Sequence, residues 1–180
     1  ERVDAVLALV ASRQPAADRK LLEGFAREYF RQADVDDLAE RSADDLLGAL
    51  LSHWQFGTQR PAATPKVRVL SPSPGEDGWG SRHTVVEIVN DDMPFLVDSV
   101  SMEIGRQGLG LHLILHPIYA VERDAQGGLK AIAARGDAPQ GARESWMYIE
   151  VDRLVEPAQR AALAAGIERV LADVRAAVTD

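Results

Sequence analysis

The sequence predicts an α+β fold in which a helical N-terminal segment precedes a mostly antiparallel sheet. Apolar residues recur at helical spacing through residues 1–57 and again from Pro157 onward. Between these stretches, short alternating runs of apolar residues are typical of strands. One of these runs, after His83, passes through a polar turn into an amphipathic helix that ends at Gly108. Helices spaced in this way cover one face of a mostly antiparallel sheet.

The composition is that of an ordinary globular protein and limits the partners that we expect. The chain has 180 residues, of which 46% are hydrophobic and 27% are charged, and its formal net charge is −8. This charge disfavours nucleic acid and anionic membranes as partners, because both are bound through clustered Lys and Arg. There is no cysteine, and no apolar stretch approaches the roughly 18 residues that span a bilayer. We expect a cytoplasmic protein that binds neither membrane nor nucleic acid.

The first 57 residues are predicted to be entirely helical. Ser42 with Asp45 resembles a capping box at the start of the last helix in this segment. Its leucine and aromatic stripe is typical of core packing rather than of a cofactor site. The stretch GTQRPAATP has the composition of a linker. We therefore divide the chain into a helical segment (1–57), a linker (58–65) and a sheet domain (66–180).

The sheet domain is predicted to contain five strands and two helices. Lys66–Leu70 alternates like an edge strand, and a loop rich in Pro and Gly follows at 71–81, where Trp79 serves either as a lid or as an anchor of the loop. The other predicted elements are a strand at 85–89, a helix with Pro94 in its first turn, a strand at 111–122 bent at Pro117, a hairpin turn at 124–128, a strand at 129–134, a loop at 137–143, a strand at 146–152 and a final helix. This order, β, β-α-β-β-β-α, indicates a ferredoxin-like arrangement.

Few residues of this chain are arranged for chemistry. Asp91 and Asp92 are the most tempting carboxylates, but an equally simple role for Asp92 is to accept N–H groups at the helix start. His112 and His116 have the spacing of a metal pair on a helix, whereas on a strand they would lie roughly 13 Å apart. His53 is expected on a helix surface or at an interface, and His83 has no evident partner. We predict no metal site.

The usual nucleotide and nucleophile motifs are missing as well. The sequence contains no G-x-G-x-x-G, no G-x-x-x-x-G-K-[ST] and no G-x-S-x-G motif. Its glycine cluster at Gly105, Gly108 and Gly110 falls at a helix end, where glycine terminates a helix, rather than at a helix start, where phosphate binds. We predict no catalytic residues in these 180 positions.

Residues 92–97, DMPFLV, resemble the Asp-x-Pro-Gly-Leu-Leu turn that follows the first strand of ACT domains. The resemblance implies a regulatory βαββαβ module that pairs through sheet edges and helices and binds amino acids near this turn. Phe95 stands where that family has glycine, so its ring would occupy space beside a bound amino acid. The last strand of the family's sheet is not accounted for: either Lys66–Leu70 takes an edge, or the strand lies beyond Asp180.

The longer string IVNDDMPFLVDSVSMEI resembles the N-terminal region of the large bacterial NAD-dependent glutamate dehydrogenases. The missing initiator Met and an end inside a helical pattern also predict a piece of a longer chain. The resemblance implies that the whole enzyme deaminates L-glutamate to 2-oxoglutarate with NAD, while this region is non-catalytic and holds no cofactor.

The same resemblance implies partners and a ligand site for this region. Its partners would be a second copy, or other domains of the same chain, and an amino-acid effector. Asp91 and Asp92 would face the effector's ammonium, whereas the N–H groups of Phe95 and Leu96 would face its carboxylate, with Asn90 beside them. The alternative, a ferredoxin-like module that binds nucleic acid, would use aromatic side chains on an open sheet face.

Overall fold

The computed structural model describes residues 2–136 and 142–179. The loop predicted at 137–143 therefore lies outside the described residues, except for its last two positions. Across the described residues, no helix combines the length and the apolar character needed to cross a membrane.

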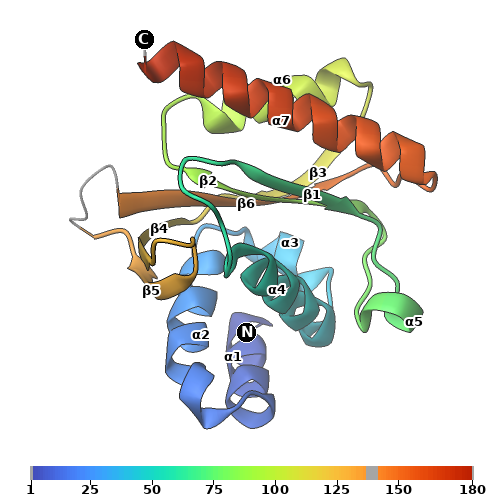
Figure 1. The fold of residues 1–180 in the computed structure, drawn as a ribbon. Coiled ribbons are helices and arrows are strands. Elements are labelled where there is room, and N and C mark those ends of the chain that lie inside the picture. Colours follow the sequence, from blue (N-terminus) through green and yellow to red (C-terminus); the bar gives the residue numbers. More distant parts are fainter. Residues whose placement is uncertain (1, 137–141, 180) are drawn as a thin grey trace.

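The described residues form three layers, with one sheet between two groups of helices (Figure 1). Helices α6 (Leu96–Arg106) and α7 (Pro157–Thr179) lie together over one face of the sheet. The helices of the N-terminal segment lie across the opposite face, and they are α1 (Arg2–Arg13), α2 (Ala16–Tyr29), α3 (Val35–Ala39) and α4 (Ala43–Gly57). The predicted α+β fold, with an N-terminal helical segment and a ferredoxin-like antiparallel sheet, is confirmed.

Every strand pair in the described sheet is antiparallel. The order is β1-β2-β6-β4-β5, and β3 also pairs with β6. The strands are β1 (Lys66–Leu70), β2 (Thr84–Asp91), β3 (Leu111–Leu115), β4 (Ile118–Arg123), β5 (Leu129–Ala134) and β6 (Arg143–Val151). Strand β1 occupies the edge beside β2, as predicted, and so fills the position that the ACT resemblance left open.

The run from β2 into α6 forms as its sequence pattern predicts. Strand β2 lies between β1 and β6 and pairs with β6 along its whole length, and helices cover both faces of the sheet, which explains why nearly all of its side chains are buried. The chain then turns, and α6 begins at Leu96, just after Pro94. Gly108, with a φ of 78°, adopts the left-handed conformation that ends the helix.

The long strand predicted at 111–122 is divided at Pro117. Strand β3 pairs with residues 148–151 of β6, whereas β4 pairs with residues 143–145 and then continues into a hairpin with β5. Gly127 in the hairpin turn has a φ of 89°, and a Cβ at this position would clash with the Arg60 carbonyl. Only glycine therefore lets the hairpin approach the predicted linker this closely.

Two apolar clusters lie on opposite faces of the sheet. The cluster under α6 and α7 includes Val86, Ile88, Val100, Ile149 and Leu163. The other cluster joins residues of the helical segment, among them Phe25, Tyr29 and Leu50, to Trp146 and Tyr148 of β6. The helical segment is thus packed directly on the sheet, and its assignment as a separate unit (1–57, with a linker at 58–65) stays a prediction.

Candidate functional site

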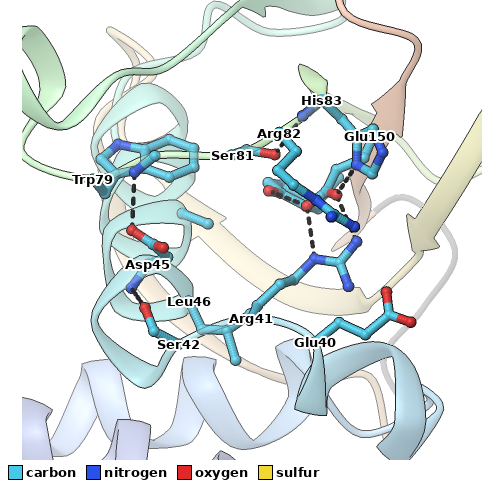
Figure 2. A pocket seen from close by; sticks show the side chains of 13 residues that line it. Glu40, Arg41, Ser42, Asp45, Leu46, Trp79, Ser81, Arg82, His83 and Glu150 are labelled. Carbon is cyan, nitrogen blue, oxygen red and sulfur yellow. Dashed lines mark hydrogen bonds and ion pairs between the residues drawn. The ribbon is translucent and has the colours of Figure 1, made fainter.

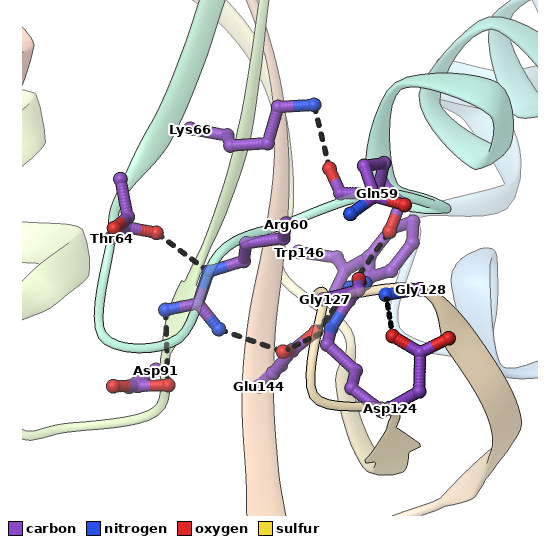
Figure 3. A network of polar contacts seen from close by, with 12 residues as sticks. Gln59, Arg60, Thr64, Lys66, Asp91, Asp124, Gly127, Gly128, Glu144 and Trp146 are labelled. Carbon is purple, nitrogen blue, oxygen red and sulfur yellow. Dashed lines mark hydrogen bonds and ion pairs between the residues drawn. The ribbon is translucent and has the colours of Figure 1, made fainter.

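The turn between β2 and α6, where the sequence places a ligand, is held by ion pairs. Arg60 Nη2 lies 3.0 Å from Asp91 Oδ1 (Figure 3), and Arg175 Nη2 of α7 donates a hydrogen bond of 2.7 Å to Asp91 Oδ2. Burial raises the pKa of Asp91, but the hydrogen bond from Arg175 and the charge of Arg60 outweigh it and hold this pKa below its usual value. Both oxygens of Asp91 are therefore engaged by residues distant in sequence.

Arg60 connects this turn to a buried carboxylate on β6 (Figure 3). Its Nη1 donates to Glu144 Oε2 at 2.7 Å, and its Nε donates to the carbonyl of Thr64 at 2.7 Å. Arg123 binds the same carboxylate through bonds of 2.8 and 2.9 Å, and the Trp146 indole donates to it at 3.2 Å. Although Arg60 stands in a stretch with linker composition, its side chain is only 2% exposed. It joins the turn, β6 and the β4–β5 hairpin.

The other predicted ligand residues point to different sides of the turn. Asn90 is buried toward the α6–α7 layer, and its Nδ2 donates to the Asp91 carbonyl at 3.2 Å, while its Oδ1 has no hydrogen-bond partner. The Asp92 N–H donates to the carbonyl of Arg143 at 3.0 Å. Leu96 belongs to the apolar core under α6. The predicted ligand residues, from Asn90 through Leu96, lie in one turn, but their side chains do not converge on one point. Their role in binding a ligand stays a prediction.

Phe95 shows why related turns have glycine at this place. Its φ is 73°, in the left-handed region, where a side chain costs roughly 1–2 kcal/mol. Its ring is 68% exposed, so it points into solvent and does not fill the space behind the turn. Core packing explains neither the strained backbone of Phe95 nor its exposed ring. Strained residues of this kind cluster at functional sites.

The histidines have separate partners. His112 Nε2 lies 2.7 Å from Asp152 Oδ1, whereas His116 Nε2 lies 2.8 Å from Ser145 Oγ. His83, for which the sequence indicated no partner, stacks on His112 with 4.0 Å between ring centroids. Among the described residues, no group of three or more His, Asp or Glu is placed to hold a metal ion.

His53, which was expected on a helix surface or at an interface, is instead fully buried in the core between α4 and the sheet. Its Nε2 lies 3.0 Å from the carbonyl of Ile88, so Nε2 carries the hydrogen and Nδ1 accepts from the Tyr29 hydroxyl at 2.6 Å. Burial lowers the pKa of His53 to about 3. The imidazole is therefore neutral and joins α2, α4 and β2.

A cavity of about 440 Å³ opens between the helical segment and the sheet (Figure 2). The start of α4, the loop before β2 and the end of β6 form its walls. Trp79 anchors this loop, since its ring packs on Gly48 of α4 so closely that a Cβ there would clash. The Gly80 N–H donates to Asp45 Oδ1 at 2.9 Å. The anchoring role is therefore the correct alternative for Trp79, and the loop that it holds also contains a short helix, α5 (Pro74–Asp77).

A buried ion pair forms one side of the cavity. Arg41 Nη2 and Nε donate to the two oxygens of Glu150 at 2.6 and 3.1 Å, and the Tyr148 hydroxyl donates at 2.8 Å (Figure 2). His83 Nδ1 lies 3.0 Å from the same carboxylate. Burial raises the pKa of Glu150, but the hydrogen bonds from Arg41 and His83 outweigh it and keep this pKa below its usual value. The ionised carboxylate holds Arg41 in place, and both of its oxygens accept hydrogen bonds.

Sequence reasoning did not single out this cavity, although one signal was present. Glu87 and Glu150 each interrupt the apolar pattern of a buried strand, and a buried carboxylate needs a cationic partner. The pattern does not say which arginine supplies the cation, because Arg41 lies 109 residues from Glu150.

The described residues do not fit a bound dinucleotide. Such sites use a parallel sheet with a glycine-rich turn at a helix start. Here β2 is antiparallel to both of its neighbours, and the turn that follows it, NDDMPF, contains no glycine. The described residues therefore lack the local geometry of an NAD site.

Comparison with known proteins agrees with the sequence resemblance. The family described as "Glutamate dehydrogenase, ACT1 domain" matches residues 25–167. The chain is 44% identical over 161 residues to the NAD-specific glutamate dehydrogenase of Halomonas elongata, and 39% identical over 157 residues to that of Pseudomonas aeruginosa. These matches cover 88% and 87% of the chain but 10% of each relative, so the chain spans about a tenth of their length. No solved structure matches the chain.

Proposed function

This chain belongs to the glutamate dehydrogenase ACT1 domain family, and from that membership we propose that it is the non-catalytic N-terminal region of an NAD-dependent glutamate dehydrogenase. The whole enzyme would act in the cytoplasm and deaminate L-glutamate to 2-oxoglutarate with NAD. The family match carries this proposal. The antiparallel sheet supports the non-catalytic part of it, because the sheet does not fit a dinucleotide.

Within such an enzyme, we propose that this region makes contacts with other subunits or with other domains of its own chain. Two large apolar side chains are exposed in this part of the molecule, Phe95 at 68% and Met102 at 74%. Phe95 immediately precedes α6, and Met102 lies within the helix. Exposed large apolar side chains support a docking role.

We further propose that the region responds to an amino-acid effector, with the turn from Asn90 to Leu96 as the site that the family resemblance implies. An effector ammonium would approach the ionised Asp91, and its carboxylate the start of α6. Because Arg60 and Arg175 already hold Asp91, binding there would have to displace one of them. Release of Arg175 would loosen α7 from the turn and so couple binding to the packing of this layer.

The contact role is tested by assembly of the full-length enzyme. We expect Phe95→Gly together with Met102→Gln to weaken subunit association, measured by mass photometry across a dilution series, while kcat per assembled enzyme stays unchanged. Val155→Gln is the matched control, since Val155 is 72% exposed but lies outside α6. Unchanged assembly would contradict the contact role, and a lower kcat with assembly intact would contradict the non-catalytic one.

The alternative, a nucleic-acid-binding module, receives no support from the sheet. Stacking of bases needs aromatic side chains on an open sheet face. In the described part of the chain, helices cover both faces, and Trp146 and Tyr148 are buried beneath the helical segment. The sheet therefore does not favour this alternative.

A further inference from the structure

Another cavity, of about 590 Å³, lies within the helical segment and is lined by residues of α1, α2 and α3. Three arginines contribute to its lining: Arg2 of α1, Arg27 in the last turn of α2, and Arg31 just after that helix. No Asp or Glu is among the described residues that line it. In a chain with a formal net charge of −8, a lining whose charges are all positive indicates that this cavity attracts an anion.

The three arginines differ in what already holds them. Arg31 Nη1 lies 3.5 Å from Glu28 Oε2, and because the Arg31 side chain is 70% exposed, water screens this pair. Arg2 Nη2 donates to the carbonyl of Ala39 at 3.2 Å, which is a neutral acceptor. Within the described residues, Arg27 makes no hydrogen bond or ion pair. Arg27 is therefore the cation that an incoming anion meets without displacing another group.

The remaining lining of this cavity is apolar. Phe30 and Leu38 are each 3% exposed, whereas Val35, at the start of α3, is 62% exposed. An exposed valine beside a cavity keeps apolar surface in water, and a ligand with CH₂ groups would cover that surface. Apolar walls with a few charged groups are typical of small-molecule sites, and a volume of about 590 Å³ lies in their range. The other apolar lining residues are Val3, Ala33 and Ala39.

The two halves of this lining select the ligand together. A small hydrophilic anion such as inorganic phosphate would leave the surface of Val35 uncovered, whereas a neutral hydrocarbon would leave Arg27 without a counter-charge. A ligand that carries an anionic group on an aliphatic chain satisfies both halves.

We propose that this cavity binds an amphiphilic anion, which is an aliphatic chain that ends in a carboxylate or a phosphate. Arg27 binds the anionic group, and the chain covers Val35 and contacts Leu38. The bound anion joins the three helices that line the cavity. This inference goes beyond the proposed function and does not depend on it, because it involves neither the turn of Asn90 to Leu96 nor the exposed side chains at α6.

Calorimetric titration of the 180-residue chain with octanoate, octyl phosphate and 1-octanol tests the proposal. Because the anionic group forms charge-assisted hydrogen bonds, we expect at least one of the two anions to bind about tenfold or more tightly than 1-octanol. The tighter of the two identifies the anionic group. The matching four-carbon anion should bind at least about tenfold more weakly, because it covers less apolar surface.

Two variants and a matched control locate the bound anion. Arg27→Gln should weaken binding of the tighter anion about tenfold and leave binding of 1-octanol unchanged. Val35→Asn should weaken binding of both the anion and 1-octanol. Lys20→Gln removes another exposed cation of α2, outside the cavity, and should leave both unchanged. Circular dichroism melts establish that each variant folds.

A single introduced thiol reports the position of the ligand directly. Because the chain contains no cysteine, Ala39→Cys places one reactive group in the lining of the cavity. We expect a saturating concentration of the tighter anion to slow its alkylation by iodoacetamide at least about threefold. Ala161→Cys, at an exposed position of α7, is the matched control and should react at the same rate with and without the anion.

Three results would overturn the cavity site. One is absence of binding by both anions, and another is equal affinity for the anions and 1-octanol. The third is an equal loss of affinity in Arg27→Gln and Lys20→Gln, or alkylation of Ala39→Cys that the anion does not slow. None of these results bears on the proposed function, which the assembly of the full-length enzyme tests separately.

Discussion

The two faces of the sheet have opposite chemistry although the same strands form them. Toward α6 and α7, β2 and β6 present Val86, Ile88, Met147 and Ile149, which pack in an apolar core. Toward the helical segment, the alternate positions present three buried carboxylates among large aromatic side chains, and these carboxylates are Glu87, Glu144 and Glu150. Because successive residues of a strand point to opposite faces, one pair of strands serves both layers.

This difference shows that the two helical layers are held in different ways. Apolar burial dominates the contact of the α6–α7 layer with the sheet, and the ion pair between Arg175 and Asp91 involves a carboxylate that is 36% exposed. Under the helical segment, Arg41 and Ser52 reach the carboxylates of Glu150 and Glu87, and each contact requires a particular position. Buried ion pairs add little net stability, because desolvation offsets their attraction, but breaking one is costly. We infer that these contacts fix where the helical segment sits.

The buried carboxylates also differ from each other. Burial raises the pKa of Glu87, and the charge of Arg68 and the Ser52 hydroxyl only partly oppose it. For Glu150 the hydrogen bonds from Arg41 and His83 outweigh burial, so its pKa is lowered. The Arg41 side chain is 15% exposed and that of Arg68 is 40% exposed, so water screens the charge of Arg68 more.

Removal of the most buried cation under the helical segment should have the largest effect. Arg60→Met leaves Glu144 buried with one arginine fewer, and we expect it to lower the free energy of unfolding by about 3–5 kcal/mol. Chemical denaturation measures this change. Arg13→Met removes the exposed Arg13–Asp44 pair and should cost no more than about 1 kcal/mol. Equal losses in the two variants would mean that the buried network has no special role.

Acid should weaken the helical layer through His53. The pKa of this residue is about 3 in the folded chain, against an ordinary value of 6.5, so the unfolded chain binds the proton between these limits. Stability is therefore lost as the pH falls from about 6.5 toward 3, and by pH 4.5 the loss amounts to about 2–3 kcal/mol. Unfolding experiments across this range should show a shallower pH dependence in His53→Gln. A slope identical to that of the wild type would exclude His53 as its source.

The difference between the two carboxylates predicts unequal costs for one substitution. Glu150→Gln should lower the free energy of unfolding by about 2 kcal/mol, because Arg41 then loses an ionised partner, whereas Glu87→Gln should cost less than about 1 kcal/mol. The pH dependences should also oppose each other. The contribution of Glu150 is lost as the pH falls through its lowered pKa, while protonation of Glu87 favours the folded state. Thermal denaturation at several pH values compares the variants, and a larger loss for Glu87→Gln would reverse the assignment.

The smallest effect is expected at the start of α6, the helix that packs on the apolar face of the sheet. Phe95→Gly relieves the left-handed backbone at the start of α6 and should raise the free energy of unfolding by up to about 1 kcal/mol. Phe95→Ala, which shortens the side chain but keeps the strain, is the matched control in the same thermal melt. Destabilisation by Phe95→Gly relative to Phe95→Ala would show that the backbone is not strained here.

The sequence was sufficient for features that depend on neighbouring residues. The Ser42 hydroxyl accepts from the Asp45 N–H at 3.1 Å, as the capping box predicts. The bend at Pro117 and the turn at Asp124 also follow from local rules for proline and glycine. The core stripes of α4 and α6 follow from helical periodicity.

Contacts between residues that are distant in the sequence could not be predicted from the sequence pattern. Arg60 stands 84 residues from Glu144, in a stretch whose Pro and Ala content predicts a linker, and only the three-dimensional packing buries it. The cavity was missed for the same reason, since α3, α4, the loop before β2 and β6 each supply part of its lining. Local patterns predict elements, whereas pairing of buried charges depends on how the layers meet.

A double-mutant cycle between Arg41 and Glu150 measures most directly whether buried ion pairs hold the helical segment on the sheet. The free energies of unfolding of the wild type, Arg41→Gln, Glu150→Gln and the double variant give the coupling between the two side chains. We expect a coupling of about 1.5–3 kcal/mol, compared with less than about 1 kcal/mol in the same cycle at the exposed Arg13–Asp44 pair. A coupling near zero between Arg41 and Glu150 would contradict the charged attachment and leave apolar packing as the cause.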